Sequence, residues 1–134
     1  MIFRPPVVTF MGHIDNGKTS LLDKIRSTNI TAKEAGGITQ HLTASHAAGI
    51  TFIDTPGHAA FQEMRFRMNH MADIAVLVVS VVDGVMAQTK ECIKSLKKTN
   101  LPIIVALNKW DLANRQPEKV KGQLLEAGLT PEEY

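Results

Sequence analysis

Short apolar runs rich in β-branched residues alternate with longer amphipathic stretches along the chain. Runs of the first kind are typical of buried strands in a parallel sheet, and apolar positions three or four residues apart indicate helices. The apolar runs predict strands at residues 7–11, 41–46, 50–53, 74–82 and 102–107. The amphipathic stretches predict helices at residues 17–26, 59–71, 88–98 and 117–127.

The sequence also predicts the connections between these elements. Residues 28–39 are polar and rich in glycine, which predicts a loop, and Ala48-Gly49 predicts a hairpin between the strands on either side. Strands that alternate with helices predict an α/β fold, with a mainly parallel sheet and helices on both faces. In such folds, ligands bind at the carboxyl ends of the strands.

Composition narrows the class of protein. A chain of 134 residues with 44% apolar and 21% charged residues is expected to form one globular domain. A net charge of +2 argues against nucleic-acid binding by bulk charge. The single cysteine, Cys92, excludes an internal disulfide and fits a reducing compartment. No apolar run reaches the roughly 18 residues of a membrane span, so we expect no membrane partner.

A phosphate-binding loop is indicated at residues 12–19, Gly-His-Ile-Asp-Asn-Gly-Lys-Thr, which fit the pattern G-x-x-x-x-G-K-[ST] between a predicted strand and a predicted helix. The glycines let backbone N–H groups surround phosphate oxygens, and the helix points its positive end at the anion. Lys18 adds charge for the β- and γ-phosphates. The predicted phosphate-binding residues are His13, Ile14, Asp15, Asn16, Gly17, Lys18, Thr19, Ser20 and Gly57.

The same loop implies a bound Mg²⁺, to which the Thr19 hydroxyl is a predicted ligand. Asp54 ends the strand at 50–53 and begins Asp-Thr-Pro-Gly, so its carboxylate is expected to hold the ion through water. Gly57 leaves its N–H free for a γ-phosphate. Thr39 follows a glycine-rich stretch and completes the Mg²⁺ shell when a γ-phosphate is present, unless it is an ordinary loop threonine.

A base-binding site is indicated at residues 108–111, Asn-Lys-Trp-Asp, directly after the strand at 102–107. The Asp111 carboxylate can accept hydrogen bonds from N1–H and N2–H₂ of guanine, whereas adenine offers neither donor on that edge. Lys109 can lay its stem along the base face. Asn108, Lys109 and Asp111 are therefore predicted to bind guanine, which indicates GTP rather than ATP. Trp110 either shields the base edge or is partly exposed.

Three segments indicate which protein family the chain resembles. Residues 10–15 (Phe-Met-Gly-His-Ile-Asp), 35–41 (Ala-Gly-Gly-Ile-Thr-Gln-His) and 54–61 (Asp-Thr-Pro-Gly-His-Ala-Ala-Phe) resemble the GTP-binding domain of bacterial-type translation initiation factor two, a translational GTPase. The resemblance covers nearly the whole chain. It implies a P-loop GTPase fold and a GTPase that helps place initiator tRNA on the small ribosomal subunit and promotes joining of the large subunit.

The resemblance also implies a catalytic residue and a location. His58 follows Asp-Thr-Pro-Gly and would orient the attacking water once the ribosome positions it; capping of the next helix is the alternative role. No arginine occupies an obvious position for an arginine finger, the residue that stabilises charge in the transition state. We therefore expect slow intrinsic hydrolysis that the ribosome stimulates. The expected location is cytoplasmic, with an organellar matrix as the alternative.

Three departures from the family pattern stand out. Asn16 replaces the usual histidine of the phosphate loop, and Val82 replaces the first of two acidic residues before Gly84. No last guanine-contacting loop follows Asp111. We therefore expect residues 1–134 to be a GTP-binding domain that lacks its last strand and helix, within a larger multidomain protein, and the strand at 102–107 to be a sheet edge. A nucleotide-free folding or interaction module, or another translational or ribosome-assembly GTPase, are the alternatives.

Overall fold

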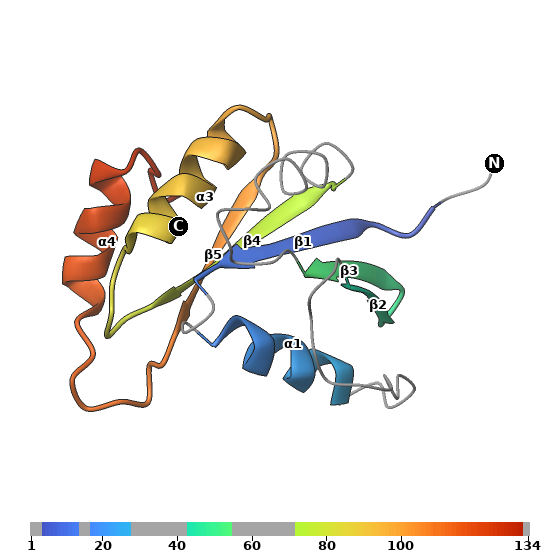
Figure 1. Ribbon diagram of the computed structural model, residues 1–134, viewed down its shortest axis with the longest axis horizontal. Coiled ribbons are helices and arrows are strands. Elements are labelled where there is room, and N and C mark those ends of the chain that lie inside the picture. Colours follow the sequence, from blue (N-terminus) through green and yellow to red (C-terminus); the bar gives the residue numbers. More distant parts are fainter. Residues whose placement is uncertain (1–3, 14–16, 28–42, 55–71, 133–134) are drawn as a thin grey trace.

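The computed structural model describes residues 4–13, 17–27, 43–54 and 72–132. Its described strands and helices follow one another in the order that the apolar pattern predicts (Figure 1). The elements in chain order are β1 (Val7–Gly12), α1 (Lys18–Ser27), β2 (Thr43–Ala47), β3 (Ile50–Asp54), β4 (Ile74–Ser80), α3 (Ala87–Lys97), β5 (Ile103–Asn108) and α4 (Pro117–Glu126). The predicted loop at 28–39 and the predicted helix at 59–71 lie outside the described residues.

One sheet organises the described part of the chain. Its strand order is β2-β3-β1-β4-β5, and every neighbouring pair is parallel except β2 and β3. The β2–β3 hairpin turns through Ala48 and Gly49, which both have positive φ, at 52° and 76°, and such a turn matches the twist of the two strands. The mainly parallel sheet and the hairpin are therefore confirmed.

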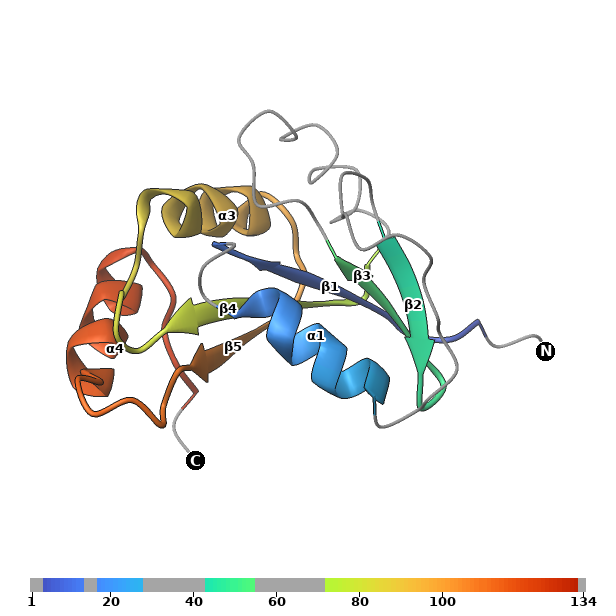
Figure 2. The ribbon, with the colours of Figure 1, turned by 60° about the horizontal axis from the view of Figure 1, so that its bottom comes forward.

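The two faces of the sheet are covered by different helices, as Figures 1 and 2 show. Because side chains alternate across a strand, Leu77 and Val79 of β4 pack with α3 and α4, whereas Val78 packs with α1. All three are fully buried. This burial on both sides explains the continuous apolar run of β4, and together with the strand order it confirms the predicted α/β fold.

Two expectations, one about where a strand ends and one about the edge of the sheet, have different outcomes. The predicted strand at 74–82 is wrong by two residues, because β4 ends at Ser80. The Ser80 hydroxyl accepts hydrogen bonds from the N–H groups of Val82 and Asp83, which turns the chain out of the sheet. The expectation that β5 is an edge is confirmed within the described residues, and Ile104 of that strand is 54% exposed.

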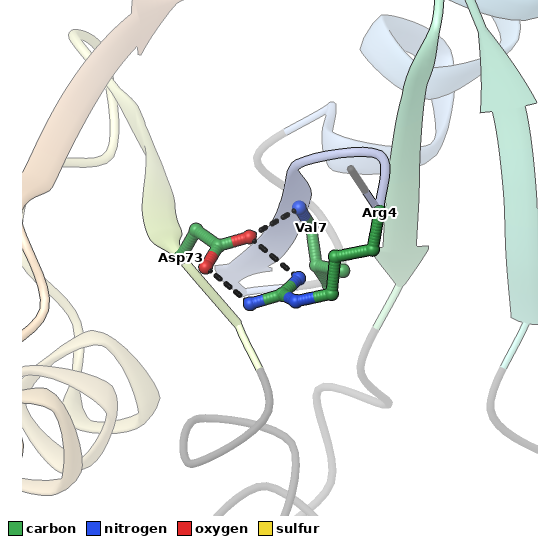
Figure 3. Close-up of polar contacts among 3 residues, drawn as sticks. All are labelled: Arg4, Val7 and Asp73. Carbon is green, nitrogen blue, oxygen red and sulfur yellow. Dashed lines mark hydrogen bonds and ion pairs between the residues drawn. The ribbon is translucent and has the colours of Figure 1, made fainter. Parts of the chain in front are cut away.

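An ion pair ties the start of β1 to the start of β4 (Figure 3). The Arg4 guanidinium donates to both carboxylate oxygens of Asp73, at 2.9 and 2.7 Å, and the N–H of Val7 donates to the same carboxylate at 2.8 Å. Asp73 N–H in turn donates to the carbonyl of Val7 at 2.7 Å. Together these contacts fix the register of the two central strands at the end opposite their carboxyl termini.

The Asp73 carboxylate makes stability depend on pH. Hydrogen bonds from Arg4 and, secondarily, from the N–H of Val7 hold the pKa of Asp73 below its ordinary value. A carboxylate with a lowered native pKa stabilises the fold above its unfolded pKa, and this contribution disappears as pH falls below about 4. In urea unfolding, Asp73→Asn should lower stability at about pH 7, and its difference from the unmodified chain should shrink towards about pH 3.

Arg4→Gln serves as the matched variant, since it removes the ion pair and leaves the hydrogen bond from Val7 to Asp73. We expect it to destabilise less than Asp73→Asn. The pair is exposed, so the effect of Arg4→Gln should also be small and should decrease at high salt. A stability difference for Asp73→Asn that stays constant across this pH range would contradict the assignment.

Candidate functional site

The carboxyl ends of four parallel strands meet along one edge of the sheet, as the common direction of β1, β4 and β5 in Figure 2 shows. β1 ends at Gly12, β3 at Asp54 and β5 at Asn108. α1 begins at Lys18, so its amino terminus lies at the same edge. The structure therefore brings together the described residues of the predicted phosphate, metal and base sites.

Two glycines of the predicted phosphate loop occupy positions where a side chain would not fit. Gly12 has φ 146°, and a Cβ there would lie 2.5 Å from the carbonyl oxygen of Val78. Gly17 has φ 84°, and a Cβ there would overlap the amide nitrogen of Asn108. Gly12 thus lies directly against β4, and Gly17 lies against the side chain that begins the predicted base site.

A buried ion pair lies at the amino terminus of α1. The Lys18 ammonium is 2.9 Å from Oδ1 of Asp54, and the two side chains are only 3% and 10% exposed. Within the described residues, Oδ1 has no aligned hydrogen-bond donor despite this short contact. Burial makes such a pair costly unless its charges are well matched, so the two charges are suited to exchange partners when a charged ligand arrives.

The oxygen atoms at this edge fit a magnesium ion. Asp54 offers a buried carboxylate oxygen without an aligned donor, and Thr19 has an exposed side chain in the first turn of α1. Across the described ranges, no group of three or more His, Cys, Asp or Glu residues could hold a metal. Mg²⁺ does not require such a group, because it is usually bound through one or two protein oxygens, waters and phosphate oxygens.

The predicted base site forms a turn directly after β5. Lys109 has φ 61°, and its carbonyl accepts a hydrogen bond from Leu112 at 3.2 Å. Asp111 is exposed, and Trp110 is 48% exposed. The Asp111 carboxylate is open to a ligand that approaches this turn.

An acidic residue that sequence reasoning did not assign to the site contacts this turn. Oδ2 of Asp83 lies 3.0 Å from the Lys109 ammonium. The hydrogen bond from Lys109, with a smaller one from Ser80, holds the pKa of Asp83 below its ordinary value. The two residues meet because Asp83 follows β4 and Lys109 follows β5, which the structure shows to be neighbouring parallel strands.

Six predicted site residues lie outside the described residues: Ile14, Asp15, Asn16, Thr39, Gly57 and His58. Among the predicted site residues that the structure does describe, His13 is half-buried and Ser20 is exposed.

No helix within the described ranges is long and apolar enough to cross a membrane.

Comparison with known proteins decides the family. The Elongation factor Tu GTP binding domain family matches residues 26–131. The chain belongs to this family. The match covers β2 to α4 and the predicted base site, and it begins after the phosphate loop.

Other relatives align over nearly the whole chain, and these alignments include the phosphate loop. Proteins named Translation initiation factor IF-2 are 54% identical in Rubrobacter xylanophilus, 59% in Moorella thermoacetica and 60% in Caldicellulosiruptor saccharolyticus. These alignments cover 98–100% of this chain, but only 20%, 15% and 16% of the three relatives. They confirm the resemblance to the GTP-binding domain of initiation factor two, and family membership supports guanine-nucleotide binding and GTP hydrolysis in general.

The contact between Gly17 and Asn108 can be tested with two alanine variants. Gly17→Ala and Gly49→Ala both place a side chain at positive φ, at a cost of about 1 kcal/mol each. Only Gly17→Ala should also displace the amide of Asn108, because nothing lies within 4 Å of a Cβ at Gly49. We expect Gly17→Ala to weaken GDP binding by about tenfold or more, equivalent to about 1.4 kcal/mol.

Equilibrium titration with a fluorescent GDP analogue measures the affinities, and thermal melts without nucleotide measure the cost of strain. Equal losses of GDP affinity in Gly17→Ala and Gly49→Ala would show that strain alone, and not contact with Asn108, is responsible.

Proposed function

We propose that residues 1–134 form a GTP-binding and GTP-hydrolysing domain of a larger, multidomain translation initiation factor. The observation that carries the proposal is the meeting of the phosphate loop, Asp54 and the base turn at one sheet edge, with Gly17 against Asn108. The lengths of the relatives support the larger protein.

Phosphate binding rests on charge and backbone geometry. On arrival of the nucleotide, the Lys18 ammonium moves from Asp54 to the β- and γ-phosphates, while the amino terminus of α1 and residues 13–20 supply N–H donors. Bound Mg²⁺ would neutralise phosphate charge. Asp54, through water, and the Thr19 and Thr39 hydroxyls would hold this ion, and the N–H of Gly57 would reach the γ-phosphate.

Guanine selection rests on the turn after β5. Asp111 accepts the two N–H groups that guanine presents and adenine lacks on that edge, while Asn108 ties the turn to the phosphate loop. An adenine base would leave the carboxylate without donors, which is costly in a closed site. GTP and GDP are therefore the proposed substrate and product.

The relatives and the family pattern support the proposed hydrolysis and the proposed partners. His58 is proposed to orient the attacking water when the large ribosomal subunit's RNA contacts the domain, so intrinsic hydrolysis is slow. Placement of initiator tRNA and joining of the subunits would depend on other parts of the larger protein. The proposed location is the cytoplasm, where translation factors of this type act.

Competition for a fluorescent GDP analogue tests the choice of base. Unlabelled GDP and GTP should displace it at concentrations orders of magnitude below those that ATP requires, because only guanine satisfies Asp111. Asp111→Asn should shift preference towards xanthosine diphosphate, whose additional carbonyl accepts from the new amide. Displacement by ATP and GDP at equal concentrations would overturn the proposed function.

A variant of His58 tests the proposed catalytic role in the full-length protein. His58→Ala should leave GDP affinity unchanged and should reduce ribosome-stimulated, single-turnover GTP hydrolysis by about 10²–10³, the usual cost of removing a positioned polar group. If stimulated hydrolysis remains at the unmodified rate, His58 has the alternative role of capping the following helix.

A further inference from the structure

The end of β5 and the turn after β4 are joined by an ion pair that the proposed nucleotide contacts do not use. Nζ of Lys109 lies 3.0 Å from Oδ2 of Asp83, and the two side chains are 30% and 38% exposed. The residues are 26 positions apart in the chain. They meet because Ser80 and Asn108 are register partners at the ends of adjacent parallel strands.

Asp83 is held in place by its own turn. The Ser80 hydroxyl is fully buried and accepts hydrogen bonds from Val82 N–H at 3.1 Å and Asp83 N–H at 3.0 Å. Gly84 N–H donates to the carbonyl of Ser80 at 2.9 Å. The carboxylate of Asp83 is thus presented from a turn that is hydrogen-bonded to the end of a central strand.

Lys109 is constrained from the other side. Its φ of 61° lies in the left-handed region, which residues other than glycine adopt at a cost. The preceding residue is fixed to the sheet, because the carbonyl of Asn108 accepts a hydrogen bond from Val81 at 3.0 Å. With its backbone fixed at one end and its ammonium bound to Asp83 at the other, the aliphatic stem of Lys109 has few conformations left.

We propose that Asp83 is a positioning residue for the guanine site, which holds the stem of Lys109 in the orientation that covers the base before the nucleotide arrives. This inference rests on the proposed function, in which Lys109 lies along the base face. Asp83 itself touches no part of the nucleotide. Its contribution is preorganisation, because an unpaired lysine side chain must be ordered at the moment of binding, which weakens affinity.

A purely structural ion pair would stabilise the fold without affecting the base site. Two variants separate these roles: Asp83→Asn keeps the shape and removes the charge, and Asp83→Glu keeps the charge. Glu118→Gln is the matched control, since it removes the carboxylate of another exposed lysine pair, at 3.4 Å from Lys121 in α4. Glu118 has no part in the proposed site.

The measurement is the Kd of a fluorescent GDP analogue for the 134-residue chain, with thermal melts of every variant in parallel. Asp83→Asn should weaken binding about two- to fivefold, the range of partly exposed ion pairs. Asp83→Glu should restore most of this loss, and Glu118→Gln should change nothing. The loss should shrink in about 1 M salt, where charges are screened within about 3 Å.

A double-mutant cycle tests whether Asp83 acts through Lys109. In a Lys109→Met background, Asp83→Asn should produce no further loss of affinity. An unchanged Kd in Asp83→Asn, or an equal loss with and without Lys109, would overturn the positioning role. So would a lower melting temperature with no change in Kd, which is the signature of a structural pair.

The outcome for the unmodified chain distinguishes this inference from the proposed function. Selective binding of GDP over ATP by the unmodified chain, with no effect of Asp83→Asn, overturns the positioning role alone. Failure of the unmodified chain to prefer guanine nucleotides overturns both, since Lys109 would then have no base to cover.

Discussion

Parallel pairing of β1 with β3 and β4, and of β4 with β5, is the constraint on which the candidate site depends. Parallel strands must all end at the same edge, so residues separated by many positions meet there. Asp54, Lys18 and Asn108 belong to different strand–helix units, yet they lie at one edge of the sheet. The apolar run of β4, buried on both faces, makes this arrangement stable.

Close backbone approach then couples the two halves of the site. Gly17 leaves room for the amide of Asn108, so the phosphate loop and the base turn contact each other directly. A shift of the phosphate loop therefore acts on the base turn directly through the Asn108 side chain, and not through the length of the sheet. The Ser80 turn adds a second link, because it places Asp83 against Lys109 of the base turn.

Three ion pairs show how burial divides their roles. Arg4 and Asp73 are exposed at the amino ends of the strands, where the pair ties β1 to β4 and is screened by salt. Lys18 and Asp54 are buried at the opposite edge, where desolvation makes the pair costly unless a ligand uses its charges. Lys109 and Asp83 are partly exposed, which suits a contact that positions a side chain.

Local sequence patterns determined much of this protein. The alternation of apolar runs and amphipathic stretches predicted the strands and helices because burial on one or two faces imposes those periods. The glycine and lysine spacing of residues 12–19 and the Asn-Lys-Trp-Asp segment predicted a phosphate site and a base site, since each depends on a few consecutive residues. Tertiary structure alone decided the rest. The pairing of Arg4 with Asp73 and the contact of Asp83 with Lys109 each join residues that are far apart in the chain, which a local pattern treats separately. Hydrogen bonds and ion pairs of this kind depend on distances in space, and the register of the folded sheet sets those distances.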